Sequence, residues 1–321
     1  MLKFLPTWRV AIYIVAAAIA IAAALTIQSS LAPSDFPLGT LVTIQPGTAL
    51  TQAANILADK RIIGSAFFYK AYVTLIRSSK GIRSGTYLFA TPESALRVAL
   101  RTAYGIDGLQ PIKVTIPEGS SLSDISMLLV KDIPNFDVKQ FLVLAKPQTG
   151  YLFPDTYFWN ITTAPQQIVN EMRANFDHQI VGASTSIAAF GKPLKDVIIM
   201  ASIVEREAAT TTDRRIVAGI LWKRITQGLA LQVDAPFYSI LGKSAKDPVT
   251  LDDLQSTSPY NTYKYAGLPP GPINNPGIES IIDTVTPIQT NYLYYLSDSK
   301  GVMHYAETHD EHVANKQKYL K

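Results

Sequence analysis

The pattern of apolar and polar residues predicts one helix that is buried on every side. Residues 197–204 form an unbroken run of apolar or small residues that ends at Glu205, and Glu207 follows two positions later. A helix that is apolar all round lies in a protein core rather than on its surface. A carboxyl group at the end of such a helix is partly desolvated, which raises its pKa as a general acid requires. The alternative is a helix end whose glutamates point into water.

A second apolar run lies near the start of the chain. Residues 10–27 are apolar apart from Tyr13 and Thr26, and at about 1.5 Å per residue a helix of this length just spans a bilayer core of about 30 Å. We therefore predict a transmembrane anchor over residues 10–31. A cleaved signal peptide, whose apolar part would be shorter, is the alternative.

The distribution of positive charge predicts the orientation of this anchor. Lys3 and Arg9 precede the apolar run, and no basic residue follows it until Lys60. By the positive-inside rule, residues 1–9 form a cytoplasmic tail and the chain beyond the anchor lies on the other side of the membrane. Residues 32–41, which contain two prolines, form the predicted linker.

An internal repeat follows the linker. Residues 42–57 return in altered form as residues 114–129, and each copy predicts a short strand, a glycine turn, a hydroxyl side chain at the helix N-cap and an amphipathic helix. In the second copy Ser121 and Asp124 have the spacing of a capping box. Such units are typical of small binding modules, and a spacer between membrane and catalytic domain is the alternative.

The other predicted elements complete an α+β fold. Helices are expected at residues 65–79, from residue 93, at 137–145, 164–180, 193–209 and 213–227, and after Thr308; a strand is expected at 85–89 and a hairpin at 292–296 and 303–306. A long loop rich in proline, glycine and tyrosine spans residues 258–277, which is typical of a functional loop. The largely helical part, residues 150–321, is the predicted catalytic domain with a C-terminal β-hairpin.

Composition excludes several classes of protein. The net charge is only +4 over 321 residues, which does not indicate nucleic-acid binding, and the absence of cysteine excludes disulfides, thiolate zinc sites and cysteine nucleophiles. His304, His309 and His312 lie close together in sequence, so a zinc site is one interpretation of this segment. Contact between the hairpin and the last helix is the favoured interpretation, so we predict neither metal nor cofactor. No Gly-x-Ser-x-Gly motif indicates a serine hydrolase.

Several motifs in order resemble one known family. They are Tyr151-Leu-Phe-Pro-Asp-Thr-Tyr157, Ala201-Ser-Ile-Val-Glu-Arg-Glu207, Leu231-Gln-Val-Asp234, Pro259-Tyr-Asn-Thr-Tyr263 and Gly267-Leu-Pro-Pro-Gly-Pro-Ile273. Their order and spacing resemble the endolytic murein transglycosylase family, also called YceG-like, over nearly the whole chain. The family includes a LysM-like peptidoglycan-binding region, which the resemblance implies for residues 42–149 with their repeat.

The resemblance implies cleavage of peptidoglycan glycan strands without water. The family's catalytic glutamate is expected to correspond to Glu205, which would protonate the oxygen between N-acetylmuramic acid and N-acetylglucosamine. It would then take the proton of the muramic acid 6-hydroxyl as a 1,6-anhydro ring closes. The implied protein is a lyase that terminates or trims nascent strands at the bacterial cytoplasmic membrane, with its catalytic part outside the cell membrane and peptidoglycan synthases as partners.

Helix geometry separates the two glutamates of this motif. At about 100° per residue, Glu205 and Glu207 lie about 200° apart, so they cannot flank one glycosidic bond as a hydrolase pair would. We predict a structural role for Glu207, such as an ion pair with Arg214 or Arg215. If a second carboxylate reaches the active site, we expect it to be Asp234 rather than Glu207.

The resemblance also implies a set of substrate-binding residues. They are Gln232, Asp234, Asn261, Thr262 and Tyr263. Hydrogen bonds that stabilise loops are the alternative role for each of them. Two positions depart from the family: Ala235-Pro236 follows Asp234 where Pro-Thr is usual, and Gln148-Thr149 replaces Leu-Glu. A non-catalytic cell-wall binding or assembly protein is the alternative function.

Overall fold

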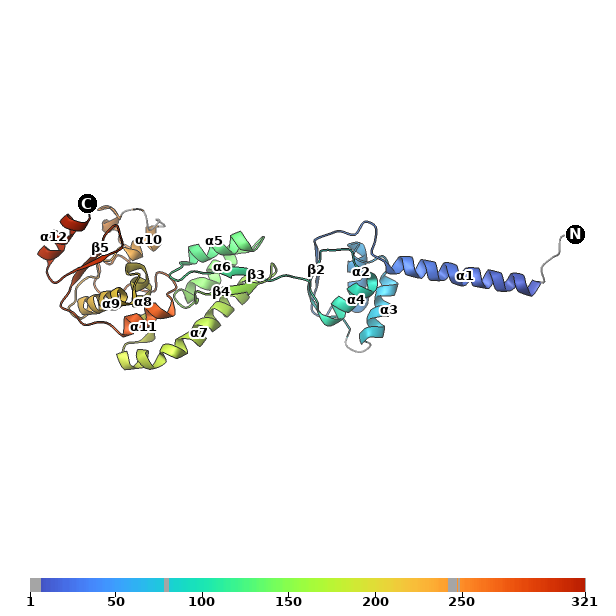
Figure 1. Cartoon of the computed structure of the whole chain (residues 1–321), viewed down its shortest axis with the longest axis horizontal. Helices are drawn as coiled ribbons and strands as arrows, with labels where there is room; N and C mark the ends of the chain where they lie inside the picture. Colours follow the sequence, from blue (N-terminus) through green and yellow to red (C-terminus); the bar gives the residue numbers. More distant parts are fainter. Residues whose placement is uncertain (1–6, 78–80, 242–246, 248, 321) are drawn as a thin grey trace. The chain divides into compact units, whose positions relative to one another are not determined.

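The chain divides into two compact units, Met1–Gln110 and Pro111–Lys321. The computed structural model describes residues 7–77, 81–241, 247 and 249–320 (Figure 1). Two predictions fall partly outside the described residues: residues 1–6 of the predicted cytoplasmic tail, and the end of the helix predicted at 65–79. Within the described residues, the strands form two-stranded antiparallel sheets, as expected of a mixed α+β protein.

The first unit packs helices against one strand pair. Its elements are α1 (Thr7–Ser30), β1 (Thr40–Ile44), α2 (Leu50–Asp59), α3 (Ala66–Arg77), β2 (Gly85–Phe89) and α4 (Ala95–Tyr104). Strands β1 and β2 pair antiparallel with Val42 opposite Tyr87. Both side chains are buried, and they form a core with residues of α2, α3 and α4.

The helix α1 covers the apolar run for which an anchor was predicted at residues 10–31. Ile12, Ile14 and Ile19 on this helix are each more than half exposed. None of the helices among the described residues meets the length and hydropathy that crossing a membrane requires.

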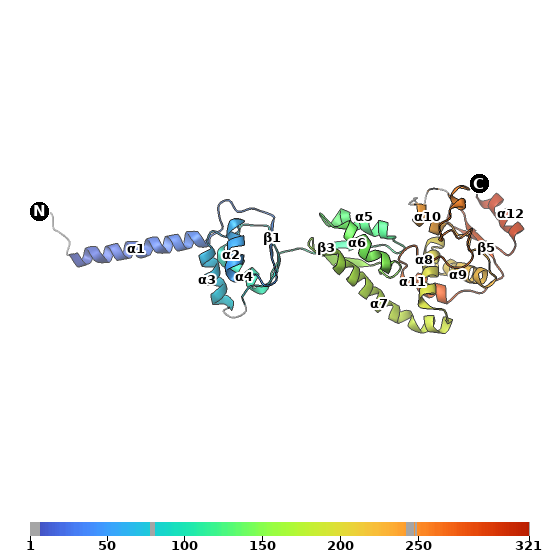
Figure 2. The ribbon, with the colours of Figure 1, turned by 180° about the vertical axis from the view of Figure 1, so that it is seen from behind.

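The second unit begins with the second copy of the repeat. Its elements are β3 (Ile112–Thr115), α5 (Leu122–Asp132), α6 (Val138–Ala145), η1 (Lys146–Gln148), β4 (Thr156–Trp159), α7 (Pro165–Phe190), α8 (Leu194–Glu207), α9 (Thr211–Thr226), α10 (Ala235–Leu241), η2 (Asp253–Gln255), α11 (Ile278–Val285), β5 (Tyr294–Ser297), β6 (Met303–Ala306) and α12 (His309–Tyr319). In the views of Figures 1 and 2, α7 extends from the β3–β4 pair to α11, which it contacts.

The two copies of the repeat both form the predicted strand and helix, as β1–α2 and β3–α5. In the second copy the capping box is confirmed, because Ser121 Oγ accepts from the Asp124 amide and Asp124 accepts from the Ser121 amide. In the first copy the predicted hydroxyl cap is wrong, since Ala49 occupies the N-cap and makes no side-chain hydrogen bond.

The predicted boundary between residues 149 and 150 lies inside the second unit. Strand β3 pairs with β4, with Val114 opposite Tyr157, so the second copy of the repeat is joined to the chain beyond that boundary. The buried Asn275 adds a further link, because its Oδ1 accepts from the amides of Gly150 and Leu152. The two compact units of the chain meet in sequence between Gln110 and Pro111.

Helix α8 is the buried helix that the apolar pattern predicts. All residues from Val197 to Val204 are buried, and the helix packs against α9 and α11. Helix α7 extends ten residues past the predicted end at 180, through Gly182, and ends where Gly191 adopts a left-handed backbone with φ of 76°. Elements α10 and α11 were not predicted.

The hairpin and final helix form as expected, with Thr308 capping α12 through a capping box. His304 Nε2 and Asp298 Oδ2 are hydrogen-bonded at 3.1 Å. The ring of His304 also stacks on that of Tyr319 of α12, with 3.6 Å between the ring centroids. His312 stacks on Tyr294 of β5. The predicted contact between hairpin and helix is therefore confirmed.

Candidate active site

The C-terminal end of α8 directs its two glutamates to different neighbours. Glu205 Oε2 accepts a hydrogen bond of 2.8 Å from the amide of Gly277, just before α11. Glu207 Oε2 accepts one of 2.9 Å from the hydroxyl of Tyr295 on β5. The separation predicted from helix geometry is therefore realised as two distinct carboxyl environments.

The carboxyl group of Glu207 has the environment of a general acid. Burial and, to a smaller extent, the nearby charge of Asp234 together raise its pKa to about 7, although hydrogen bonds from Tyr295 and the Ala235 backbone oppose the shift. A group with this pKa exists in both protonation states near neutral pH, so it can both give and take a proton. Glu207 was predicted to be structural.

The ion pair predicted for Glu207 does not form among the described residues. Arg214 instead pairs with Asp283 at 2.6 Å, and Arg215 donates to the carbonyl of Thr286. Without a cationic partner the carboxyl group keeps its preference for the protonated form. The prediction of a pair with Arg214 or Arg215 was therefore wrong, because these side chains join α9 to α11.

Two of the predicted substrate-binding residues, Asp234 and Tyr263, lie near Glu207. The hydroxyl of Tyr263 donates to Asp234 at 2.6 Å, and Asp234 lies close enough to Glu207 to raise its pKa. Gln232 is exposed, has a left-handed φ of 54°, and its side-chain oxygen accepts from Arg224. Strained polar residues of this kind cluster at functional sites.

Two of the predicted residues hold the loop instead. The side chain of Asn261 is fully buried. Its Nδ2 donates to the carbonyls of Leu254 and Ser256, and its Oδ1 accepts from the backbone amides of Tyr263 and Lys264. Thr262 Oγ1 donates to the carbonyl of Val233 and accepts from its amide. In this arrangement neither side chain has a polar atom free for substrate, so both correspond to the loop-stabilising alternative.

The residues around Glu205 include a carboxyl that sequence reasoning missed. Burial raises the pKa of Glu118, and the charge of Glu205 is the next largest cause. Its neighbour Gly119 has φ of 70°, and a Cβ there would lie only 3.0 Å from Glu205 Cγ. The signal was present in the second repeat, whose turn reads Pro-Glu-Gly where the first reads Gln-Pro-Gly.

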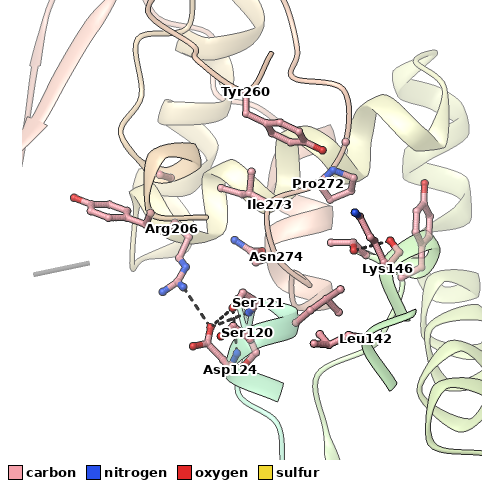
Figure 3. Close-up of a pocket in the computed structure, with 18 of the residues that line it drawn as sticks. Ser120, Ser121, Asp124, Leu142, Lys146, Arg206, Tyr260, Pro272, Ile273 and Asn274 are labelled. Atoms are coloured by element: carbon pink, nitrogen blue, oxygen red, sulfur yellow. Dashed lines mark hydrogen bonds and ion pairs between the residues drawn. The ribbon is translucent and has the colours of Figure 1, made fainter. Parts of the chain in front are cut away.

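Neighbours of both glutamates line a cavity of about 1630 Å³, although neither Glu205 nor Glu207 is among the described residues that line it. Glu118 and Gly119 line it on the Glu205 side, and Ala235 and Tyr238 of α10 line it on the Glu207 side. Arg206, which lies between the two glutamates in sequence, also lines it and points toward Asp124 in Figure 3.

The opposite walls combine aromatic, apolar and cationic side chains. Tyr260 and Pro272 come from the long loop at 258–277, whereas Leu142 and Lys146 follow from α6 and η1 (Figure 3). A groove with aromatic faces and scattered polar groups suits an extended sugar chain. Over the described part of the chain, no group of three or more His, Cys, Asp or Glu residues could hold a metal ion.

The raised pKa of Glu207 predicts a pH-dependent cost to stability. The unfolded chain gives up this proton near the ordinary value of 4.5, whereas the folded protein keeps it to about 7. Stability therefore falls as pH rises through this window, by about 3 kcal/mol. We expect the free energy of unfolding of Glu207→Gln, relative to that of the wild type, to rise by up to this amount between pH 4 and pH 8, as measured by chemical denaturation. An equal difference at both pH values would contradict the raised pKa.

Comparisons with known proteins indicate the family of the chain. A sequence model of the YceG-like family matches residues 42–318. An endolytic murein transglycosylase of Bacillus subtilis (strain 168) is 28% identical over 306 residues, covering 87% of this chain and 84% of that protein. The endolytic murein transglycosylase of Streptococcus pneumoniae serotype 2 is 30% identical over 171 residues, covering 52% of this chain and 31% of that protein. The crystal structure of a yceG-like protein from Listeria monocytogenes aligns with a TM-score of 0.58 and 28% identity, over 86% of this chain and 98% of that chain.

Proposed function

The chain belongs to the YceG-like family, and we propose that it is an endolytic transglycosylase that cleaves peptidoglycan glycan strands. The names of its relatives support the reaction class. One observation in this chain carries the proposal most directly. The carboxyl group of Glu207 has a pKa of about 7 and accepts a backbone hydrogen bond from Ala235, a residue that lines a cavity of about 1630 Å³.

Glu207, rather than the predicted Glu205, is the proposed general acid and base. Burial and Asp234 keep Glu207 partly protonated near neutral pH, and Tyr263 donates a hydrogen bond to this Asp234. Glu205, the assignment implied by the family resemblance, is the alternative, because its neighbours Glu118 and Gly119 also line the cavity. Substitution of each glutamate separately decides between them.

The proposed reaction needs one carboxyl group and no water. Glu207 gives its proton to the oxygen that joins C1 of N-acetylmuramic acid to N-acetylglucosamine, and that C1–O bond breaks. The muramic acid O6 then bonds to C1, and its proton passes to the Glu207 carboxylate, which is thereby ready for the next cycle. Asp234 stabilises the protonated form of Glu207 at the start and end of this cycle.

Product analysis tests the proposed reaction. Intact glycan strands are incubated with the full chain, and the new ends are identified by mass spectrometry. We expect 1,6-anhydro-muramic acid ends within the strands, because O6 replaces water as the nucleophile. Reducing ends would indicate a hydrolase, and unchanged strands would favour the alternative function, a non-catalytic cell-wall binding or assembly protein.

We further propose that the chain acts at a membrane, with the catalytic unit on the extracytoplasmic face. The apolar run at 10–27 and the exposed isoleucines of α1 support this location. The full chain is then expected to stay with the membrane fraction in high salt and to require detergent for release. Recovery in the soluble fraction would contradict it.

A LysM-like role for the strand–turn–helix units at 42–149 is part of the same proposal. Such units would hold the glycan while the cavity acts on it, near the synthases that extend nascent strands. A chain that lacks residues 32–110 is expected to be retained less on insoluble peptidoglycan than the full chain. Equal retention of the two chains would contradict a peptidoglycan-binding role for the first unit.

A further inference from the structure

Two carboxyl groups meet at one glycine beside the cavity, on the side of α8 away from Glu207. Glu205 Oε2 accepts from the Gly277 amide, and Glu118 Oε1 lies 2.0 Å from the position that a Cβ on Gly277 would occupy. Only glycine leaves room for the Glu118 carboxyl in this position. The two carboxylates are therefore held close together although their charges repel each other.

The cations around this pair are committed to other carboxylates. Arg206 of α8 pairs with Asp124 of α5 at 3.9 Å, and Arg214 of α9 pairs with Asp283 at 2.6 Å. Across the part of the chain that the structure describes, no ion pair includes Glu118 or Glu205. The charge of Arg214 still lowers the pKa of Glu118, whereas Glu279 at the start of α11 adds negative charge and helps to raise it.

A third acceptor lines the same cavity and has no donor. Asn274 is 1% exposed, and its Nδ2 donates to the carbonyl of Ser202 at 2.7 Å, which fixes the orientation of the amide. Its Oδ1 is buried without a hydrogen-bond partner among the described residues. Figure 3 places Asn274 between Arg206 and Ser121. A buried acceptor without a donor costs about 1–3 kcal/mol, and a ligand N–H group at this end of the cavity would offset that cost.

We propose that this end of the cavity binds a primary ammonium group of the substrate, with Glu118, Glu205 and Asn274 as its acceptors. An ammonium group has three N–H donors and a positive charge, which match one amide oxygen and two unpaired carboxylates. The proposal rests on the proposed function, since it adds a subsite to the same cavity. The ammonium belongs either to the side chain of a diamino acid in a peptide attached to the glycan or to a sugar that lacks its N-acetyl group.

Two pairs of soluble probes distinguish these sources by calorimetry on the full chain. The first pair is a muramyl peptide with lysine and the same peptide with Nε-acetyl-lysine. The second is a trisaccharide of glucosamine and the corresponding trisaccharide of N-acetylglucosamine. We expect the free amine of one pair to bind about tenfold more tightly than its acetylated partner, and that pair identifies the source. Equal affinities within both pairs would overturn the proposal.

Matched variants then assign the effect to the carboxyl pair. Glu118→Gln is expected to abolish the preference for the free amine, whereas Glu279→Gln, which removes an exposed carboxyl that lies near Glu118 but outside the subsite, is expected to keep it. A preference that survives in Glu118→Gln would overturn the assignment. None of these measurements needs turnover, so a chain that binds amines but releases no anhydro ends would refute only the proposed function.

The wild-type chain provides a second test if the variant fails to fold. An ammonium group favours the charged form of Glu118, whose pKa is raised in the free protein, so binding releases a proton. Affinity for the free amine is therefore expected to increase as pH rises from 4 to 7, while the acetylated probe shows no such change. Identical pH dependence of both probes would overturn the proposal.

Discussion

Glu207→Gln is expected to lower kcat by about a thousandfold or more on intact glycan strands. The amide keeps the size of the side chain and can still accept from Tyr295, but it can neither protonate the leaving oxygen nor accept the proton of O6. Both halves of the proposed reaction lose the same group, so the effect falls on kcat rather than on KM. Release of anhydro-ended products, followed by mass spectrometry at several substrate concentrations, measures it.

Glu205→Gln is the matched control from the same helix. Glu205 bonds to the Gly277 amide and contributes to the proposed ammonium subsite, so we expect a higher KM and a change in kcat below about tenfold. Both variants are compared by circular dichroism to verify the fold. If Glu205→Gln were inactive while Glu207→Gln kept its activity, the proton chemistry would belong to Glu205, as the family resemblance implies.

Most of the local structure follows from short-range patterns in the sequence. The run at 197–204 predicted a buried helix, and Ser121, Asp137 and Thr308 predicted three helix starts that the structure places at the same residues. Each of these signals acts within one helical turn. Caps and apolar runs are therefore readable without knowledge of the fold.

The environments of the two glutamates could not be derived in this way. The pKa of Glu207 depends on Asp234, Tyr295 and the Ala235 backbone, which lie 27 to 88 residues away in the chain. Burial by the helix itself would act on both glutamates, so only the tertiary neighbours distinguish them. The turn of Glu118 differs from that of the first repeat, but only the pairing of the second repeat with the loop around residue 275 brings Glu118 to the site.

Asn275 joins the turn at Ser120 to the segment at residues 150–152, and Asn275→Ala is expected to destabilise the second unit by about 3–5 kcal/mol. Its fully buried side chain accepts from the Gly150 and Leu152 amides at 2.8 and 3.1 Å and donates to the Ser120 carbonyl at 3.0 Å, so alanine leaves all three groups without this partner. Because Ser120 follows the turn that carries Glu118, the loss also loosens one wall of the cavity. Asn170→Ala, at an exposed position of α7 with a single bond to Gln166, is the control and is expected to change stability by less than about 0.5 kcal/mol. Similar unfolding free energies for both variants in urea would show that the Asn275 side chain does not hold these segments together.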